Sequence, residues 1–293
     1  MERETLKKIG LSLYQDRDDC SIKNDYGKCL LIGGCKQYCN SILISSYFAS
    51  LSGTGYVSLG VPSSIYQIVA SCSYETNVFE ISKDKADYIS FEKNQFNKIL
   101  STYTSILYGN GILDCQENYS LLVSLINEYK GNMIIDATGL RMLSRINDYK
   151  FAGNVLLTPH LGEANALFSC NLHTRDAKAY VELAKKYCVQ HNCDILLKSN
   201  RSILVSKDGK VESAVDIDST SLAKAGSGDG LAGYLAGLLS YATKKIDFDD
   251  IVIFGDYVIH KSAYFAQKDS LIGLEDIISC KQKIKDVLLD LIK

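Results

Sequence analysis

A glycine-rich segment carries the densest chemical signal of the sequence. It reads Ala-Lys-Ala-Gly-Ser-Gly-Asp-Gly-Leu-Ala-Gly over residues 223–233 and leads directly into an amphipathic stretch. The backbone amides of such a loop can converge on an anion at a helix N-terminus, which suits a phosphate group. The segment therefore predicts a phosphate-binding site.

Asp229 stands where this anion site would end. A carboxylate there would face a hydroxyl group in line with a bound phosphoryl group, which is the geometry of a base that assists phosphoryl transfer. Asp is also a common helix-capping residue, so the motif leaves both interpretations open. Gly228, Gly230 and Gly233 also match the dinucleotide fingerprint, but that fingerprint requires a preceding strand, and 216–221 is predicted to be a polar loop.

Two further segments place polar side chains at the ends of predicted strands. His160 and Glu163 follow the run Leu-Leu-Thr-Pro, and Lys198 closes the run Ile-Leu-Leu-Lys. Ligands of parallel α/β sheets bind beyond the carboxyl ends of the strands, and a lysine there can meet a nucleotide phosphate. A structural histidine, a glutamate that complements the helix dipole and a surface lysine are the alternatives.

Short apolar runs alternate along the chain with longer stretches of helical period. The elements that they predict would position the residues named above. The runs predict parallel strands buried on both faces, hence an α/β fold. The Asp-Gly pair at 208–209 predicts a hairpin turn. The predicted strands are 29–33, 56–61, 105–108, 133–136, 155–158 and 195–198, the hairpin arms are 202–206 and 210–215, and the last helices are 231–241, 248–267 and 274–292.

Composition excludes several classes of function. The 293 residues carry a formal net charge of −2, and 46% are hydrophobic. The basic field that nucleic-acid binding needs is lacking, and so are a membrane-spanning run and the apolar core of a signal peptide. We therefore expect a cytoplasmic protein with no nucleic-acid or membrane partner. With two prolines and no linker-like stretch, we expect one domain over 1–293.

The ten cysteines predict no zinc site. No C-x-x-C pair occurs, and the four histidines are not spaced to complete a site. In a reducing compartment, most of these cysteines are expected to be small buried hydrophobic residues.

Taken together, the motifs resemble the ADP/ATP-dependent NAD(P)H-hydrate dehydratases of the ribokinase-like superfamily. The blocks run in the family's order over roughly 15–290 and are Lys23 to Gly27, Gly33-Gly34, Thr158 to Glu163, Leu197-Lys198 and Gly226 to Asp229. The resemblance implies a three-layer α/β/α sandwich with a mostly parallel central sheet, without a fused epimerase domain. Where the family has Gly-Pro-Gly and Leu-Lys-Gly, this chain has Gly109-Asn110-Gly111 and Leu197-Lys198-Ser199.

The resemblance also implies a repair reaction. ADP would phosphorylate the ring hydroxyl of the S form of NADHX or NADPHX, and loss of phosphate would restore NADH or NADPH, giving AMP. Mg²⁺ and ADP, or ATP, would be the cofactor and phosphoryl donor, and the assembly would be a homotetramer. The alternatives are a ribokinase-like kinase of a small alcohol, such as a vitamin precursor or sugar, and a non-catalytic nucleotide-binding descendant. His160, where such kinases carry Asn, favours the dehydratase.

Residue roles follow from the same resemblance. Asp229 would be the catalytic base, and Glu163 would hold Mg²⁺ through water. The anion hole and nucleotide site would comprise Lys198, Ser199, Asn200, Arg201, Ser202, Gly226, Ser227 and Gly228. The NAD(P)HX site would comprise Ser41, Gly111, His160 and Asp229.

Overall fold

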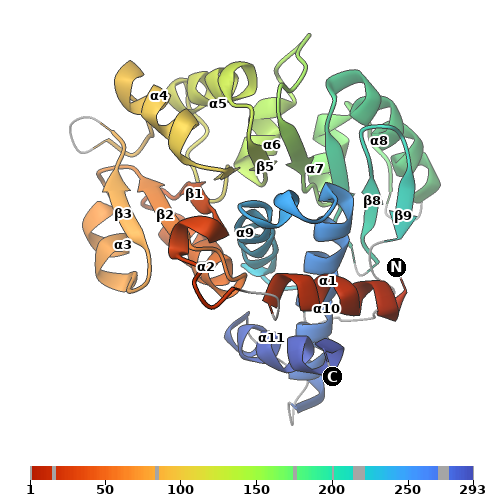
Figure 1. The fold of residues 1–293 in the computed structure, drawn as a ribbon. Helices are drawn as coiled ribbons and strands as arrows, with labels where there is room; N and C mark the ends of the chain where they lie inside the picture. Colours follow the sequence, from red (N-terminus) through yellow and green to blue (C-terminus); the bar gives the residue numbers. More distant parts are fainter. Residues whose placement is uncertain are drawn as a thin grey trace.

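A central β-sheet organises the fold (Figure 1). The computed structural model describes residues 2–14, 18–82, 86–173, 177–199, 201–213, 222–269 and 277–292. The strands in these residues are β1 (Lys28–Ile32), β2 (Tyr56–Val61), β3 (Asn77–Glu80), β4 (Ser105–Tyr108), β5 (Asn132–Ile135), β6 (Asn154–Leu157), β7 (Asp194–Leu197), β8 (Ile203–Val205) and β9 (Val211–Ser213). Within the described residues they form one nine-stranded sheet in the order β3-β2-β1-β4-β5-β6-β7-β8-β9. The pairs from β3 to β7 are parallel, and β8 and β9 add antiparallel.

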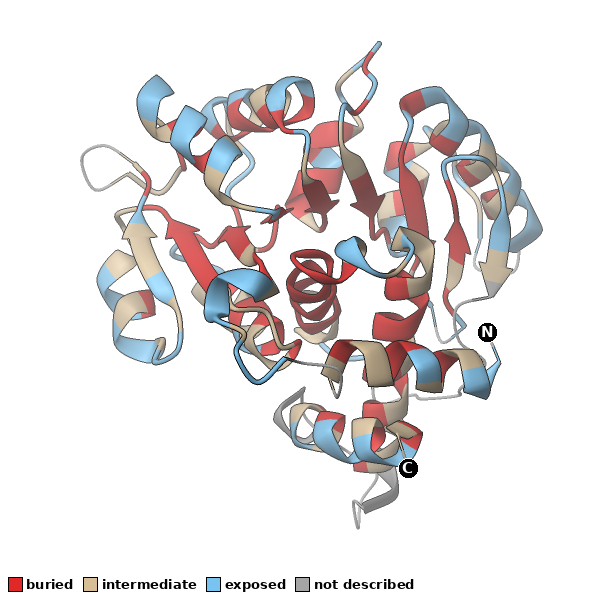
Figure 2. Ribbon diagram, viewed as in Figure 1, coloured by how far each residue is buried: buried red, intermediate tan, exposed pale blue. Residues whose placement is uncertain are grey.

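Helices cover both faces of this sheet (Figures 1 and 2). The helices of one face are α1 (Arg3–Tyr14), α2 (Cys39–Leu51), α9 (Ser227–Leu239), α10 (Phe248–Asp269) and α11 (Ile277–Ile292). Those of the other face are α4 (Lys93–Thr102), α5 (Gln116–Glu128), α6 (Thr138–Leu143), α7 (Leu161–Leu167) and α8 (Ala177–His191). Beside β3 lies α3 (Tyr66–Cys72), and the short helices η1 (Lys23–Tyr26) and η3 (Ala242–Lys244) lie in connections.

Alternation along the strands explains the two cores. In β1, Cys29 and Leu31 belong to the core on the side of α9, whereas Leu30 and Ile32 belong to the core on the side of α5. The inner strands therefore bury apolar side chains on both faces, as the continuous apolar runs predict, whereas the edge strand β3 is partly exposed. The arrangement confirms the three-layer α/β/α sandwich with a mostly parallel sheet.

Helix α9 lies at the centre of the molecule and is held there by close contact with α2. All residues of α9 from Gly230 to Leu239 are buried. A Cβ atom at Gly233 would overlap the backbone carbonyl of Ser45, so the two helices approach as closely as their backbones allow. This contact sets the position of the α9 N-terminus at the carboxyl ends of the strands.

The predicted elements agree with the structure except at a few places. All six predicted parallel strands and the hairpin are confirmed, with Gly209 at φ +82° in the turn. The short, partly exposed β3 was not predicted, and α9 begins at Ser227 rather than 231. Five of the ten cysteines are buried, three are intermediate and two are exposed, so the expected burial holds for half of them.

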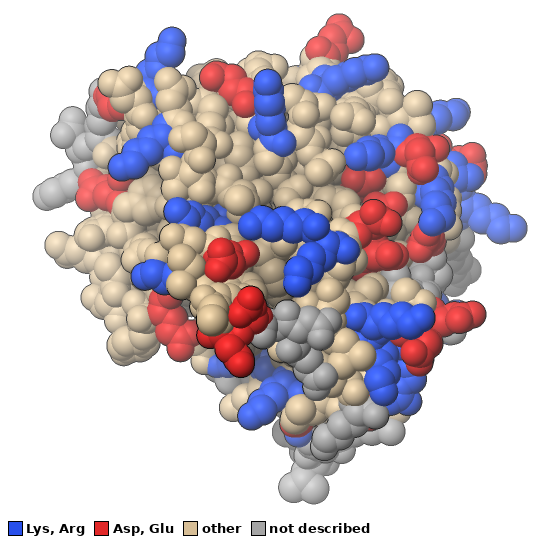
Figure 3. Space-filling view, viewed as in Figure 1, with Lys and Arg blue, Asp and Glu red and all other residues tan. Residues whose placement is uncertain are grey.

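Two observations concern the surface. Within the described residues, no helix combines the length and the apolar character that a bilayer span needs. On the face shown in Figure 3, basic and acidic side chains are interspersed.

We expect Gly233→Ala to destabilise the protein, although alanine favours helix formation. The added methyl group must push α2 away from α9, at a cost of about 1–3 kcal/mol. Gly10→Ala in α1 is the matched control, because its Cβ would lie at ordinary contact distance, 3.6 Å from Phe254 and Ile292, and should stabilise by up to about 1 kcal/mol. Urea unfolding of both variants measures this difference, and equal effects would contradict the packing argument.

Candidate active site

A buried carboxylate joins the ends of four neighbouring strands. Asp136 follows β5 and is 2% exposed. It accepts hydrogen bonds from Asn110 Nδ2 at 3.1 Å, Thr158 Oγ1 at 2.9 Å and Lys198 Nζ at 2.6 Å. These donors follow β4 and β6, which flank β5, and β7, which lies beside β6. The polar side chains at the carboxyl edge of the sheet therefore form one network.

Asp229 connects this network to α9. It lies in the first turn of the helix, and its Oδ1 accepts a hydrogen bond from Asn110 Nδ2 at 2.6 Å. Burial raises the pKa of Asp229 to about 6; the charge of Asp136 adds to this effect, and hydrogen bonds from Asn110 and Ser41 and the charge of Lys198 oppose it. A carboxyl group with this pKa can accept a proton near neutral pH.

The start of α9 and Lys198 lie together in an arrangement that could hold an anion. The N-cap is Gly226 at φ +93°, with no side-chain cap, so Asp229 is not the capping residue. First-turn amides lack acceptors within the helix and carry its positive dipole end. A Cβ at Gly228 would lie 3.4 Å from Lys198 Nζ, which places the ammonium group beside these amides.

Lys198 remains charged in this setting. Burial lowers its pKa, but the carboxylates of Asp136 and Glu163 raise it by more, so the pKa lies above its ordinary value. The distance from Lys198 Nζ to Glu163 Oε2 is 3.9 Å. The cation is therefore held between two carboxylates rather than free on the surface.

His160 and Glu163 form a capping box at the start of α7. Glu163 Oε2 accepts from the backbone amide of His160 at 2.9 Å, and His160 Nδ1 accepts from the amides of Gly162 and Glu163 at 3.0 and 3.2 Å. A neutral imidazole with Nδ1 as acceptor carries its proton on Nε2. The His160 side chain is 61% exposed and can also contact a ligand.

A cavity of about 500 Å³ opens beside these groups, between the segment after β7 and helices α9 and α10. Its lining residues are His160, Lys198, Ser199, Ser202, Leu222, Ala223, Lys224, Ser227, Gly228, Leu231, Ile259 and His260. Six of the predicted site residues thus share one cavity.

The other predicted residues in question lie outside the lining of this cavity or outside the described residues. Ser41 and Gly111 approach each other beside Asp229, since a Cβ at Gly111 would lie 2.9 Å from that of Ser41. Arg201 is exposed and is not part of the cavity lining. Asn200 and the predicted polar loop 216–221 fall outside the described residues.

Sequence reasoning assigned no role to several residues of this site. Asn110, Asp136 and Thr158 each stand just after a strand, and that position was the available signal. On α10, His260 lines the cavity, with its Nε2 at 3.5 Å from Asp256 Oδ1 and 3.4 Å from Ser202 Oγ. The signal for Asp256 and His260 was their spacing of four residues within the mostly apolar middle of this helix.

Burial controls the protonation of this pair on α10. Burial raises the pKa of Asp256 to about 7 and lowers that of His260 to about 4. At neutral pH the imidazole of His260 is therefore uncharged. His260 therefore adds an uncharged polar group to the lining of the cavity.

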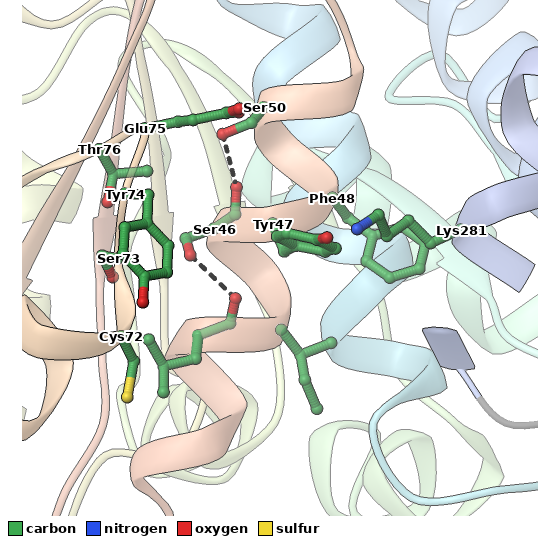
Figure 4. A pocket seen from close by; sticks show the side chains of 12 residues that line it. Ser46, Tyr47, Phe48, Ser50, Cys72, Ser73, Tyr74, Glu75, Thr76 and Lys281 are labelled. Carbon is green, nitrogen blue, oxygen red and sulfur yellow. Dashed lines mark hydrogen bonds between the residues drawn. The ribbon is translucent and has the colours of Figure 1, made fainter. Parts of the chain in front are cut away.

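A second cavity, of about 440 Å³, lies between α2, the segment 72–76 and Lys281 (Figure 4). The Lys281 ammonium group sits over the ring of Tyr47, 3.0 Å from its centroid. None of the predicted site residues lines this cavity, so it is separate from the site at the strand ends.

The described residues contain no group of three or more His, Cys, Asp or Glu side chains that could hold a metal ion. Glu163, 11% exposed beside Lys198 and His160, offers a single carboxylate. One carboxylate suits Mg²⁺, which keeps several waters and takes its other ligands from substrate phosphates.

Comparison with known proteins agrees with this geometry. A family model described as NAD(P)H-hydrate dehydratase matches residues 29–283. The chain belongs to the NAD(P)H-hydrate dehydratase family.

Named relatives of this dehydratase family fall into two groups. The bifunctional NAD(P)H-hydrate repair enzyme of Dictyoglomus turgidum is 26% identical over 239 residues, which cover 80% of this chain and 45% of that protein. The ADP-dependent (S)-NAD(P)H-hydrate dehydratase of Staphylococcus aureus is 26% identical over 234 residues, 79% of this chain and 78% of that protein. The chain spans about half the length of the bifunctional relatives it matches.

Solved structures share the fold. The ADP/ATP-dependent NAD(P)H-hydrate dehydratase of Bacillus subtilis, co-crystallised with ATP and Mg²⁺, has a TM-score of 0.79 at 21% identity, covering 100% of this chain and 98% of that one. A ribokinase-like superfamily protein of Enterococcus faecalis has a TM-score of 0.79 at 18% identity, covering 99% and 95%.

We expect Asp256→Asn to stabilise the protein increasingly as pH rises from about 4 to about 7. The folded-state pKa lies above the ordinary value of 3.8, so ionisation favours the unfolded chain across this window, and the wild type loses stability that an amide keeps. The gain should reach about 2–4 kcal/mol above pH 7. Urea unfolding across this window tests it, with the exposed Asp19→Asn as control; a gain independent of pH would contradict the assignment.

Proposed function

We propose that the chain catalyses ADP-dependent dehydration of the S form of NADHX and NADPHX to NADH and NADPH, with AMP and phosphate as products. The observation that carries this proposal is the placement of Asp229 in the same helical turn as the α9 anion site, with Lys198 beside it. A base and an anion hole at this spacing serve phosphoryl transfer to a hydroxyl group.

The proposed reaction has two steps. The ring hydroxyl of the hydrated nicotinamide attacks the β-phosphorus of ADP, the bond from that phosphorus to the bridging oxygen breaks, and AMP leaves. Asp229 accepts the hydroxyl proton in this step. The ring C–O bond then breaks with loss of phosphate, a proton leaves the neighbouring ring carbon, and the C=C bond forms. Phosphate leaves more readily than hydroxide, which is why a nucleotide is used.

The other residues bind and orient the two substrates. The amides of Gly226 to Gly228 and the Lys198 ammonium group stabilise charge on the transferred phosphoryl group. The 500 Å³ cavity, with Ser199 and Ser202, takes the nucleotide. His160 at its edge, with Ser41 and Gly111 near Asp229, contacts the hydrated dinucleotide.

Glu163 would hold Mg²⁺ through water beside the phosphates. The ion, when bound, neutralises negative charge on the phosphates that the protein's amides and Lys198 orient. The names of two relatives, one ADP-dependent and one ADP/ATP-dependent, support a nucleotide donor, and we favour ADP.

We further propose a cytoplasmic homotetramer. The exposed aromatic side chains of Tyr38, Tyr47 and Tyr74 support an assembly, because aromatic residues are enriched in protein interfaces.

We expect the purified chain with Mg²⁺, ADP and hydrated NADH to increase absorbance at about 340 nm, the band of the reduced nicotinamide. Asp229→Asn should lower this rate by about 100- to 10,000-fold, because it removes the base. Asp194→Asn is the matched control, since Asp194 is a buried carboxylate at the start of β7 whose pKa is also raised by burial, and it should keep the rate. A stable phosphate ester without the absorbance change would indicate a kinase, and no product at all a nucleotide-binding protein.

The rate should also depend on pH. Since burial raises the pKa of Asp229 to about 6, kcat/KM should be constant above this value and fall tenfold per pH unit below it, as the base becomes protonated. A pH–rate profile measures this limb. A profile without a transition near pH 6 would contradict the role of Asp229 as base.

A further inference from the structure

Asn110 holds an unusual position between two carboxylates. It follows β4, and its side chain is completely buried. Its Nδ2 donates to Asp229 Oδ1 at 2.6 Å and to Asp136 Oδ2 at 3.1 Å. Both acceptors are carboxylate oxygens, so the NH₂ group, with its two hydrogens, must be the end of the amide that faces them.

The other end of the amide is not used by the fold. Asn110 Oδ1 is buried and has no hydrogen-bond partner among the described residues. An unsatisfied buried acceptor costs about 1–3 kcal/mol, and buried amides that serve only structure normally satisfy both ends. The cost of the unsatisfied Oδ1 therefore has to be offset by the two hydrogen bonds that Nδ2 donates to the carboxylates.

The effect on Asp229 follows from its surroundings. The groups that face it are Asp136 after β5, Lys198 after β7, Asn110 after β4 and Ser41 from α2. Burial and the negative charge of Asp136 favour the protonated form of Asp229, whereas the hydrogen bond from Asn110 favours the ionised form. Without this hydrogen bond, only Ser41 and Lys198 would oppose the effect of burial and of the Asp136 charge on Asp229.

We propose that Asn110 is a positioning residue of the proposed dehydratase reaction: its amide fixes the Asp229 carboxylate at the α9 anion site, ionised and ready to accept the substrate proton. The inference rests on the proposed function of Asp229 as base. It assigns to Asn110 no contact with substrate, because its side chain is fully buried.

The test compares Asn110→Ala with Asn154→Ala, which removes a partly buried amide at the start of β6, at the opposite edge of the sheet. Asn110→Ala should lower kcat about 10- to 100-fold, the effect of one hydrogen bond to a charged group. The KM for ADP and the affinity for AMP should change less than about twofold, since the nucleotide cavity is not lined by Asn110. The acidic limb of the pH–rate profile should move to higher pH.

A merely structural role would not move that limb. Loss of kcat equal to that of Asn154→Ala, or an unchanged limb, overturns the proposal. The isosteric Asn110→Asp guards against a folding defect of the alanine variant: it keeps the volume but adds a third carboxylate, so the limb should move further in the same direction.

A second measurement separates this inference from the proposed function. Carbon-13 NMR of aspartate-labelled protein follows the Asp229 carboxyl group directly, assigned by its loss in Asp229→Asn. In Asn110→Ala its pKa should rise from the wild-type value of about 6. If wild-type protein shows no dehydratase activity, this titration still decides whether Asn110 controls Asp229: an unchanged pKa overturns the inference, and a raised one supports it.

Discussion

The buried Asp136 carboxylate is the interaction on which the site depends. A carboxyl group that is 2% exposed is costly to bury unless donors satisfy its oxygens. Its three donors stand after β4, β6 and β7, so they reach it only when β4 and β6 flank β5 and β7 lies beside β6. The sheet order is thereby tied to the chemistry: the same hydrogen bonds that satisfy Asp136 also place Lys198 and Asn110 where they act.

The helix layer supplies the second constraint. The amides of the α9 N-terminus reach the strand ends because α9 lies against α2 with backbone in direct contact at Gly233. A larger residue there would displace the anion site from Lys198 and the base from Asn110. The geometry at the N-terminus of α9 therefore depends on the packing in the middle of the same helix.

Much of the fold follows from local patterns in the sequence. Strands buried on both faces appear as continuous apolar runs, and the Asp-Gly turn marks the hairpin. The strand β3 was not predicted because its four residues are partly exposed at the edge of the sheet and form no continuous apolar run. The first turn of α9 was not predicted because its glycines are typical of loops; in the structure it continues the helix that is buried from Gly230 onward.

The candidate site was only partly predictable because some of its residues stand in local motifs and others are brought together only by the sheet. Asp229, His160 and Lys198 stand in motifs with a local signature. The network of Asn110, Asp136 and Thr158 depends on the order of strands in the sheet, which no local pattern specifies. The contact between Asn110 and Asp136 becomes visible only when residues 26 positions apart are placed at hydrogen-bond distance.

The composition of this cluster has a consequence for ligand binding. Asp136, Glu163 and Asp229 lie around the Lys198 ammonium group, so the cluster is negative before any phosphate arrives. A nucleotide brings more negative charge into the same space, and the electrostatic balance must be restored by cations. Because burial raises the pKa of Asp229 to about 6, a proton can also be taken up here at mildly acidic pH, but it occupies the proposed base and so competes with the reaction. We therefore expect proton uptake to be thermodynamically linked to nucleotide binding, so that the buffer takes part in the binding equilibrium.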